Sequence, residues 1–437
     1  MSPTRRSLER LGFDQAIVVG QIREYGCGRP METWLREGVR YVRVGRTTYH
    51  STSWNNFVDF LLAFIRHKFG RGWYDRQQGL PIAVRHPVYQ QFAEIHAAHR
   101  AQSPDARQLV SVRATGRINA LIALAYDLYL CEHNQAIPKE LLRRLRNERE
   151  YEGALYEAHL AGLFSRAGFR IEFEDEKDKR RTHCEFTAIN LGTGRKFSVE
   201  AKSVTSLSAR AGNTDQPPEV RGKLFEALSK RADHTRIIFI ELNRRIEREC
   251  PVPEWAHRLV QQIRRAEQDM RLSDGSEPEP AYVYITNRPF LVQDQTPTSG
   301  YQAAAMGFRV SDFPPERGGH LLRMQQARMK HIEAYQLFCA MHQTNLAPQQ
   351  FFDHPIAPLF RSLSGDHQDD IQHPFDAFDF LFSTYSKSDA ERLRGWMAGH
   401  IPTQQLSLMS QLELAEAYCA GVGQSMWRDI SDKRNRL

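Results

Sequence analysis

Apolar and polar positions alternate along two neighbouring stretches in the middle of the chain, residues 182–190 and 195–204. A period of two is typical of β-strands that turn one face toward a core. The residues between the stretches, Leu191-Gly192-Thr193-Gly194, supply glycine where a tight turn needs a positive φ. The pattern therefore predicts a β-hairpin.

The alternation also predicts which side chains of this hairpin share a face. On the second strand Glu200 and Lys202 point one way, and the apolar residues beside them point the other way. On the first strand Glu185 and His183 lie opposite the apolar residues. Pairing of the strands can therefore place Glu185, Glu200 and Lys202 on one face. Two carboxylates near a lysine are costly to group unless a metal ion or a salt bridge compensates them.

Periodic segments on both sides of the hairpin predict an α/β fold with a mixed central sheet flanked by helices. The helices are expected at residues 141–167, 222–231 and 255–270, and further strands at 169–174, 236–242 and 281–286. The run at 236–242 is almost continuously apolar, as in a strand buried on both faces. Gly168 is expected to end the first of these helices.

The two ends of the chain have a different pattern. Residues 1–140 predict a mostly helical domain with a short hairpin near 39–49 and a buried helix near 118–130, and residues 316–437 predict a C-terminal helical region. The α/β core between them is expected at 141–315. In the C-terminal region the cluster Asp366, His367, Asp369, Asp370 and His373 predicts either a metal site or, more simply, a polar loop between helices.

Composition limits the classes of protein that fit. At 437 residues, two or three domains are expected. No apolar run is long enough to span a bilayer, and the N-terminus lacks the apolar segment of a signal peptide, so no membrane partner is expected. The six cysteines have no Cys-x-x-Cys spacing, which fits a reducing cytoplasm and argues against a cysteine-built zinc site. The net charge of +7 weakly favours an anionic partner.

The charged residues of the core form a recognisable motif. Glu200-Ala201-Lys202 is a Glu-x-Lys element, Glu185 is an acid 200 − 185 = 15 residues upstream, and Glu157 lies on the preceding helix. This arrangement resembles the PD-(D/E)XK nuclease superfamily, which has a restriction-endonuclease-like fold. In that family the upstream acid is usually Asp after Pro, whereas here it is Glu185 after a cysteine.

The resemblance implies a metal-dependent nuclease, with DNA as the expected substrate and defence or repair as the expected setting. It implies that Glu185, Glu200 and the carbonyl of Ala201 bind Mg²⁺ or Mn²⁺, and that Glu157 binds a water or a second ion. It also implies that Lys202 orients or deprotonates the attacking water and stabilises the transition state.

Cations near the hairpin are candidates for phosphate contacts: Arg195, Lys196, Arg221 and Lys223. Glu219 and Glu226 interleave with them, so a solvated helix face is the alternative. Two other functions stay open. The core is either a non-cleaving module that binds nucleic acid or protein, or an α/β scaffold in which Glu200 and Lys202 form a salt bridge. A homodimer or a partner subunit is also left open.

Overall fold

The computed structural model describes residues 26–29, 31–102, 115–174, 184–204, 220–244, 254–288, 302–314, 321–343 and 347–351. The chain divides into two compact units, Met1–Trp54 with Gln350–Leu437, and Asn55–Gln349. The domain boundaries expected near 140 and 315 both fall inside the second unit, because helices before 140 and after 315 pack on its core. The acidic and histidine cluster at 366–373 lies outside the described residues.

The first unit contains a three-stranded antiparallel sheet. Its strands are β1 (Glu32–Arg36), β2 (Val39–Val44) and β3 (Thr47–Ser51). The hairpin expected near 39–49 is confirmed as β2 and β3, whereas β1 was not expected. The sheet is stabilised by a stacked pair of rings, Trp34 and Tyr41, whose centroids lie 5.0 Å apart.

The second unit is built on a six-stranded mixed sheet in the order β4-β5-β6-β7-β8-β9. The strands are β4 (Phe169–Phe173), β5 (Phe186–Asn190), β6 (Lys196–Ser203), β7 (Thr235–Glu241), β8 (Ala281–Asn287) and β9 (Gln302–Phe308). β6, β7 and β8 run parallel, and the other neighbours pair antiparallel. The expected hairpin is confirmed as β5 and β6, and β4, β7 and β8 were also expected.

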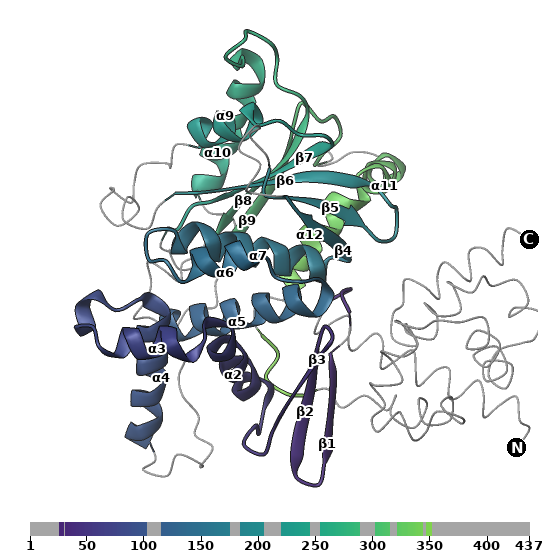
Figure 1. The fold of residues 1–437 in the computed structure, drawn as a ribbon. Coiled ribbons are helices and arrows are strands. Elements are labelled where there is room, and N and C mark those ends of the chain that lie inside the picture. The colour runs from purple at the N-terminus through teal and green to yellow at the C-terminus, as the bar shows by residue number, and fades with distance from the viewer. Residues whose placement is uncertain are drawn as a thin grey trace, which may run out of the picture. The chain divides into compact units, whose positions relative to one another are not determined.

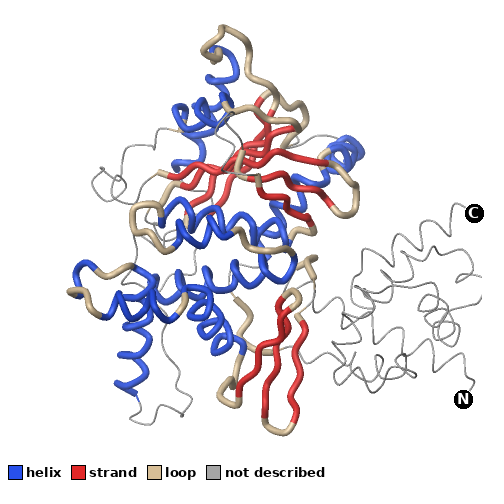
Figure 2. Tube along the Cα trace, viewed as in Figure 1, coloured by secondary structure: helices blue, strands red, loops and turns tan. Residues whose placement is uncertain are grey.

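Helices cover both faces of this sheet (Figure 1). The described helices of the second unit are α2 (Phe57–Phe69), α3 (Arg71–Gln78), α4 (Pro87–Gln102), α5 (Gly116–Asn134), α6 (Lys139–Leu145), α7 (Tyr151–Arg166), α9 (Arg221–Ser229), α10 (Glu254–Asp269), α11 (Leu321–Lys330) and α12 (Ile332–Gln343), with a 3-10 turn η1 at Ile82–Val84. Figure 2 shows the helices α9 and α10 on one side of the strands and the remaining helical layers chiefly on the other. The described residues thus form a mixed α/β fold with a six-stranded mixed sheet flanked by helices.

Side-chain packing shows which helices cover which face. Alternate residues of β7 and β8, including Ile238, Ile240 and Val283, join one apolar cluster with the inner faces of α9 and α10. On the opposite face the ring of Phe164 in α7 contacts Phe186 and Phe239, with centroids 5.4 and 5.8 Å apart. Each face of the sheet therefore has its own helical cover. We call them the α9–α10 face and the α7 face.

The helix expected over 141–167 is two helices, α6 and α7, separated by a turn. Gly168, with a φ of 82°, follows α7 as expected. α7 lies between the sheet and α5, and 14 of its 16 residues are buried. The two helices touch closely at Gly162, where an added Cβ would lie 2.6 Å from Oδ1 of Asp127, so only glycine fits this contact.

None of the described helices is both long and apolar enough to cross a lipid bilayer.

Candidate active site

Glu200 lies in the middle of β6, on the α9–α10 face of the sheet. Its neighbour across the parallel pairing is Ile238, which belongs to the apolar cluster of that face. The side chain is fully buried, with 0% exposure, while Lys202 on the same face is 19% exposed. The alternation of β6 therefore places both residues as the sequence predicts, with Lys202 nearer to solvent.

The structure brings Glu185 to the same place. Phe186 pairs with Val199, and the N–H of Glu185 donates to the carbonyl of Val199 at 2.9 Å, which sets Glu185 opposite Glu200. One ammonium group joins the two carboxylates. Nζ of Lys230 lies 2.7 Å from Oε1 of Glu200 and 3.5 Å from Oε1 of Glu185.

Lys230 directly follows α9, so the end of this helix places the ammonium group beside Glu200 on the α9–α10 face. Lys202 reaches the same oxygen, with Nζ 3.1 Å from Oε1 of Glu200, and its ammonium also lies 3.8 Å from Glu226 of α9. Two lysines and two hairpin glutamates thus form one charge cluster, which we call the acid–lysine cluster: Glu185, Glu200, Lys202 and Lys230. The alternation of the strands does not by itself predict that Lys230 joins this cluster.

The cluster perturbs the protonation of its members. The pKa of Glu200 is raised to about 7, first by burial and then by the negative charge of Glu185, against the opposing effect of Lys230 and Lys202. Burial by itself lowers the pKa of Lys230, but the carboxylates of Glu200 and Glu185 outweigh it, so that this pKa is raised. Burial, followed by the charge of Glu200, raises the pKa of the nearby Cys184 thiol to about 12. This thiol is therefore held neutral and is a poor nucleophile or ligand.

Two further oxygen atoms lie at the site, a side-chain oxygen of Glu200 and the carbonyl oxygen of Ala201. Oε2 of Glu200 is buried and has no hydrogen-bond partner among the described residues, although buried carboxylate oxygens are normally satisfied. The carbonyl of Val199 points toward β5, where it accepts the N–H of Glu185. Successive carbonyl groups of a strand point to opposite sides, so the carbonyls of Val199 and Ala201, two residues apart, point to the same side of β6. Because β5 begins at Phe186, opposite Val199, the carbonyl of Ala201 lies beyond the first residue of β5.

These donors suit a hard divalent cation. Two carboxylates and a main-chain carbonyl are oxygen ligands, and Mg²⁺ is commonly held by one or two carboxylates together with water and substrate phosphate. Within the described part of the chain no group of three or more His, Cys, Asp or Glu side chains could hold a metal. His183, which neighbours Glu185 in sequence, is outside the described residues.

Glu157 is not brought to this cluster. It lies on α7, which covers the opposite face of the sheet, and it is buried in an ion pair with Arg144 of α6. The prediction that Glu157 binds a metal beside Glu185 and Glu200 therefore has no geometric basis. α7 is buried almost all round, so its glutamate needs an internal cation, and Arg144 supplies it.

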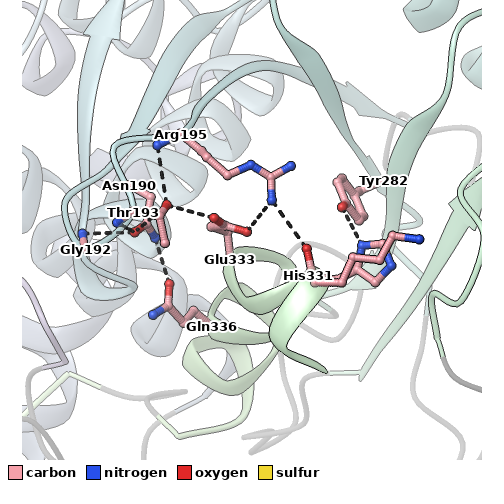
Figure 3. A network of polar contacts seen from close by, with 9 residues as sticks. Asn190, Gly192, Thr193, Arg195, Tyr282, His331, Glu333 and Gln336 are labelled. Carbon is pink, nitrogen blue, oxygen red and sulfur yellow. Dashed lines mark hydrogen bonds and ion pairs between the residues drawn. The ribbon is translucent and has the colours of Figure 1, made fainter. Parts of the chain in front are cut away.

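Arg195 has an internal partner rather than a free guanidinium. Its Nη1 lies 3.0 Å from Oε2 of Glu333 in α12, and its guanidinium covers the ring of Phe197. The turn of the hairpin is fixed to the same helix. Thr193 donates to Glu333 at 2.7 Å, and Asn190 donates to Gln336 at 2.7 Å (Figure 3). These contacts anchor the β5–β6 turn, and Arg195 acts in them as a structural residue.

The other expected phosphate contacts are dispersed. Arg221 pairs with Asp269 at 2.9 Å and Lys223 pairs with Glu226 at 3.3 Å, so each already has an acidic partner. Lys196 is exposed at the start of β6. It lies on the face of Glu200 but four residues away, about 13 Å along the strand.

A second buried carboxylate lies on the α7 face, at the end of β7. Oε2 of Glu241 accepts the hydroxyl of Thr286 at 2.7 Å, and its Oε1 accepts the N–H groups of Arg288 and Asn243 at 2.7 and 3.2 Å. Thr286 in turn contacts the hydroxyl of Tyr156 in α7 at 2.8 Å. Both oxygens of Glu241 are thus satisfied within the fold.

No family model, no curated protein and no solved structure matches the chain.

Proposed function

We propose that the chain is a divalent-metal-dependent phosphodiesterase that cleaves nucleic acid, with DNA as the expected substrate, on a core similar to the PD-(D/E)XK nucleases. The order of elements from α7 to β7 supports the similarity, since it runs helix, three antiparallel strands, helix and parallel strand. The observation that carries the proposal is the single ammonium of Lys230 shared by Glu185 and Glu200.

The shared ammonium of Lys230 supports a metal site because it lies where a metal ion would lie between the two carboxylates. Two carboxylates that converge on one point repel each other unless positive charge lies between them. Lys230 supplies that charge when no metal is bound. The unsatisfied Oε2 of Glu200 and the outward carbonyl of Ala201 are the further oxygen donors beside Glu185. We expect these three residues to hold Mg²⁺ or Mn²⁺.

Each residue then has a defined task. The metal would polarise the phosphoryl oxygens and activate water. Glu185 and Glu200 hold it, which requires Glu200 to be ionised. Lys202, more exposed than Glu200, keeps an ammonium beside the position of the scissile phosphate, where negative charge grows in the transition state. Lys230 is released from the carboxylates and adds a second positive charge there.

The proposal is tested by incubating purified protein with single- and double-stranded DNA and RNA in Mg²⁺, Mn²⁺ or EDTA. Cleavage that requires metal and is lost in both Glu200→Ala and Lys202→Ala is expected. Arg170→Ala is the matched control, since Arg170 is an exposed residue that pairs with its neighbour Glu172 on β4. Full activity in both site variants would falsify the assignment. Metal-independent binding without cleavage would instead support the alternative of a non-cleaving module.

A further inference from the structure

α10 has one apolar and one basic side. Its inner residues, among them Leu259, Ile263 and Ala266, are buried against the sheet. Its outer residues at helical spacing are His257, Arg258, Gln261, Arg264, Arg265 and Gln268, and all of them are exposed. Between His257 and Gln268 no acidic residue interrupts this outer row, which we call the α10 row; Glu254 precedes it in the first turn of the helix.

Two acids of α10, Glu267 and Asp269, lie on the flanks of this row and have partners of their own. Glu267 accepts the N–H of Arg309 at 2.5 Å, and Asp269 pairs with Arg221 of α9. Among the described residues neither Arg264 nor Arg265 forms an ion pair. At Arg264 and Arg265 the α10 row therefore presents positive charge that the described parts of the fold do not neutralise, in contrast to Arg195, Arg221 and Lys223.

The row faces the same side of the sheet as the candidate active site. α9 and α10 share the apolar cluster with Ile238, whose strand partner is Glu200. Arg221 and Asp269 connect the two helices at 2.9 Å. A polyanion that lies along the outside of α10 therefore approaches the side of the protein on which Lys202 and Lys230 are partly exposed.

We propose that the α10 row binds the sugar–phosphate backbone of the nucleic acid whose cleavage is proposed above. From His257 to Gln268 the row extends 11 residues, about 16 Å of helix at 1.5 Å per residue. That length spans about five phosphates of one strand at 3.4 Å each. Arginine and glutamine side chains are common phosphate donors in such interfaces.

An anionic membrane fits the row less well. Helices that bind in the plane of a membrane insert an apolar face into the lipid. The apolar face of α10 is occupied by the core, and the exposed large apolar side chains of the described residues lie elsewhere, such as at Leu80 and Ile82. The row offers hydrogen-bond donors and charge, which are the features that recognise phosphate along a strand.

This inference rests on the proposed function, and its test separates the two. Binding is measured in EDTA as the fluorescence anisotropy of labelled 20-nucleotide single strands and 20-base-pair duplexes, over a range of salt concentrations. The variant is Arg264→Glu with Arg265→Glu. The matched control is Arg71→Glu with Arg76→Glu on α3, which changes the net charge equally at exposed positions across the sheet from α10. Hydrolysis of bis(p-nitrophenyl) phosphate with Mn²⁺ reports on the site itself.

The α10 variant is expected to lose about tenfold or more in affinity, with a log–log salt slope less steep by about 2. The control is expected to lose less than about threefold, because long-range charge effects are screened at physiological salt. Equal losses in the two variants, or no binding by the wild type, would overturn the inference. If the charge reversal unfolds the protein, the variant Arg264→Gln with Arg265→Gln is used in the same binding measurement, and a loss of affinity is again expected.

Failure of the proposed function gives a different result. If the α10 variant loses affinity as expected but the wild type hydrolyses no diester with any metal, the row binds nucleic acid and the core does not cleave it. If the small diester is hydrolysed equally by the wild type and the α10 variant while nucleic-acid affinity is unchanged, the active site stands and the row is a solvated helix face.

Discussion

Two buried glutamates on neighbouring strands have opposite surroundings. Glu241 of β7 points to the α7 face, and Glu200 of β6 points to the α9–α10 face. Glu241 is held by three donors of the fold, namely one hydroxyl and two main-chain N–H groups. Glu200 has one oxygen beside two lysine ammonium groups and the other without a hydrogen-bond partner in the described residues.

The difference separates a structural carboxylate from a candidate catalytic one. Donors fixed in the main chain satisfy a buried carboxylate permanently. Lysine ammonium groups on flexible stems are exchangeable, and an unsatisfied oxygen beside them can accept a new partner. The buried carboxylate of Glu241 is therefore fixed in its hydrogen-bond network, whereas the buried carboxylate of Glu200 keeps an oxygen that can bind a cation.

The largest expected effect is on catalysis. Glu200→Gln should lower kcat/KM for nucleic-acid cleavage by about a thousandfold or more, because it removes a metal ligand and the charge of the site. Glu241→Gln should change kcat/KM per folded molecule by less than about threefold. Steady-state kinetics on both purified variants, with folded fraction measured by circular dichroism, makes the comparison. An equal loss of kcat/KM in the two variants would contradict the different roles of Glu200 and Glu241.

Stability should respond in the reverse order. Glu241→Ala leaves the Thr286 hydroxyl and two N–H groups without their acceptor, which should lower the free energy of unfolding by about 2–4 kcal/mol. Glu200→Gln removes a buried acid whose ionisation is disfavoured and should leave the free energy of unfolding unchanged or raised by about 1 kcal/mol. Urea denaturation at pH 7.5 measures both values. A larger loss for Glu200→Gln than for Glu241→Ala contradicts the account.

A smaller effect is expected in the dependence of stability on pH. The pKa of Glu200 is raised to about 7 in the folded protein, mainly by burial, and the unfolded value is near 4.5. The unfolded state therefore loses its proton first, so the contribution of Glu200 to the free energy of unfolding falls as pH rises from about 4.5 to about 7. Glu200→Gln should make the curve of unfolding free energy against pH flatter in that window. Urea titrations at pH 4.5, 6 and 7.5 check it, and an unchanged slope would show that Glu200 ionises normally in the fold.

Local pattern was sufficient to predict the hairpin and its faces. The alternation from Phe197 to Lys202 and the turn before it are confirmed, including Gly194 with a φ of 71°. The strand β9 was missed because its sequence, Gln302 to Phe308, has a run of alanines and no alternation. Strand β1 was missed because its two apolar residues, Trp34 and Leu35, are adjacent and do not alternate with polar residues.

Contacts between distant segments could not be predicted in the same way. Lys230 reaches Glu200 from the end of a helix 30 residues later, and periodicity gives no register between a helix end and a strand. Glu157 shows the converse error, because a helical stripe defines which residues neighbour it on α7 but not which face of the sheet α7 covers. Arg195 was assigned to phosphate because its partner, Glu333, lies 138 residues away.

The proposed metal site consists of Glu185 and Glu200, with Lys230 between them in the metal-free protein, and it is tested by titration of Mn²⁺ into the protein. At pH 8, isothermal titration calorimetry should give weaker binding by about tenfold or more in Glu200→Gln and Glu185→Gln. Lys230→Met should bind Mn²⁺ more tightly than the wild type, because the competing ammonium is gone, and Glu241→Gln should match the wild type. Wild-type affinity in Glu200→Gln, or weaker binding in Lys230→Met, would contradict the account.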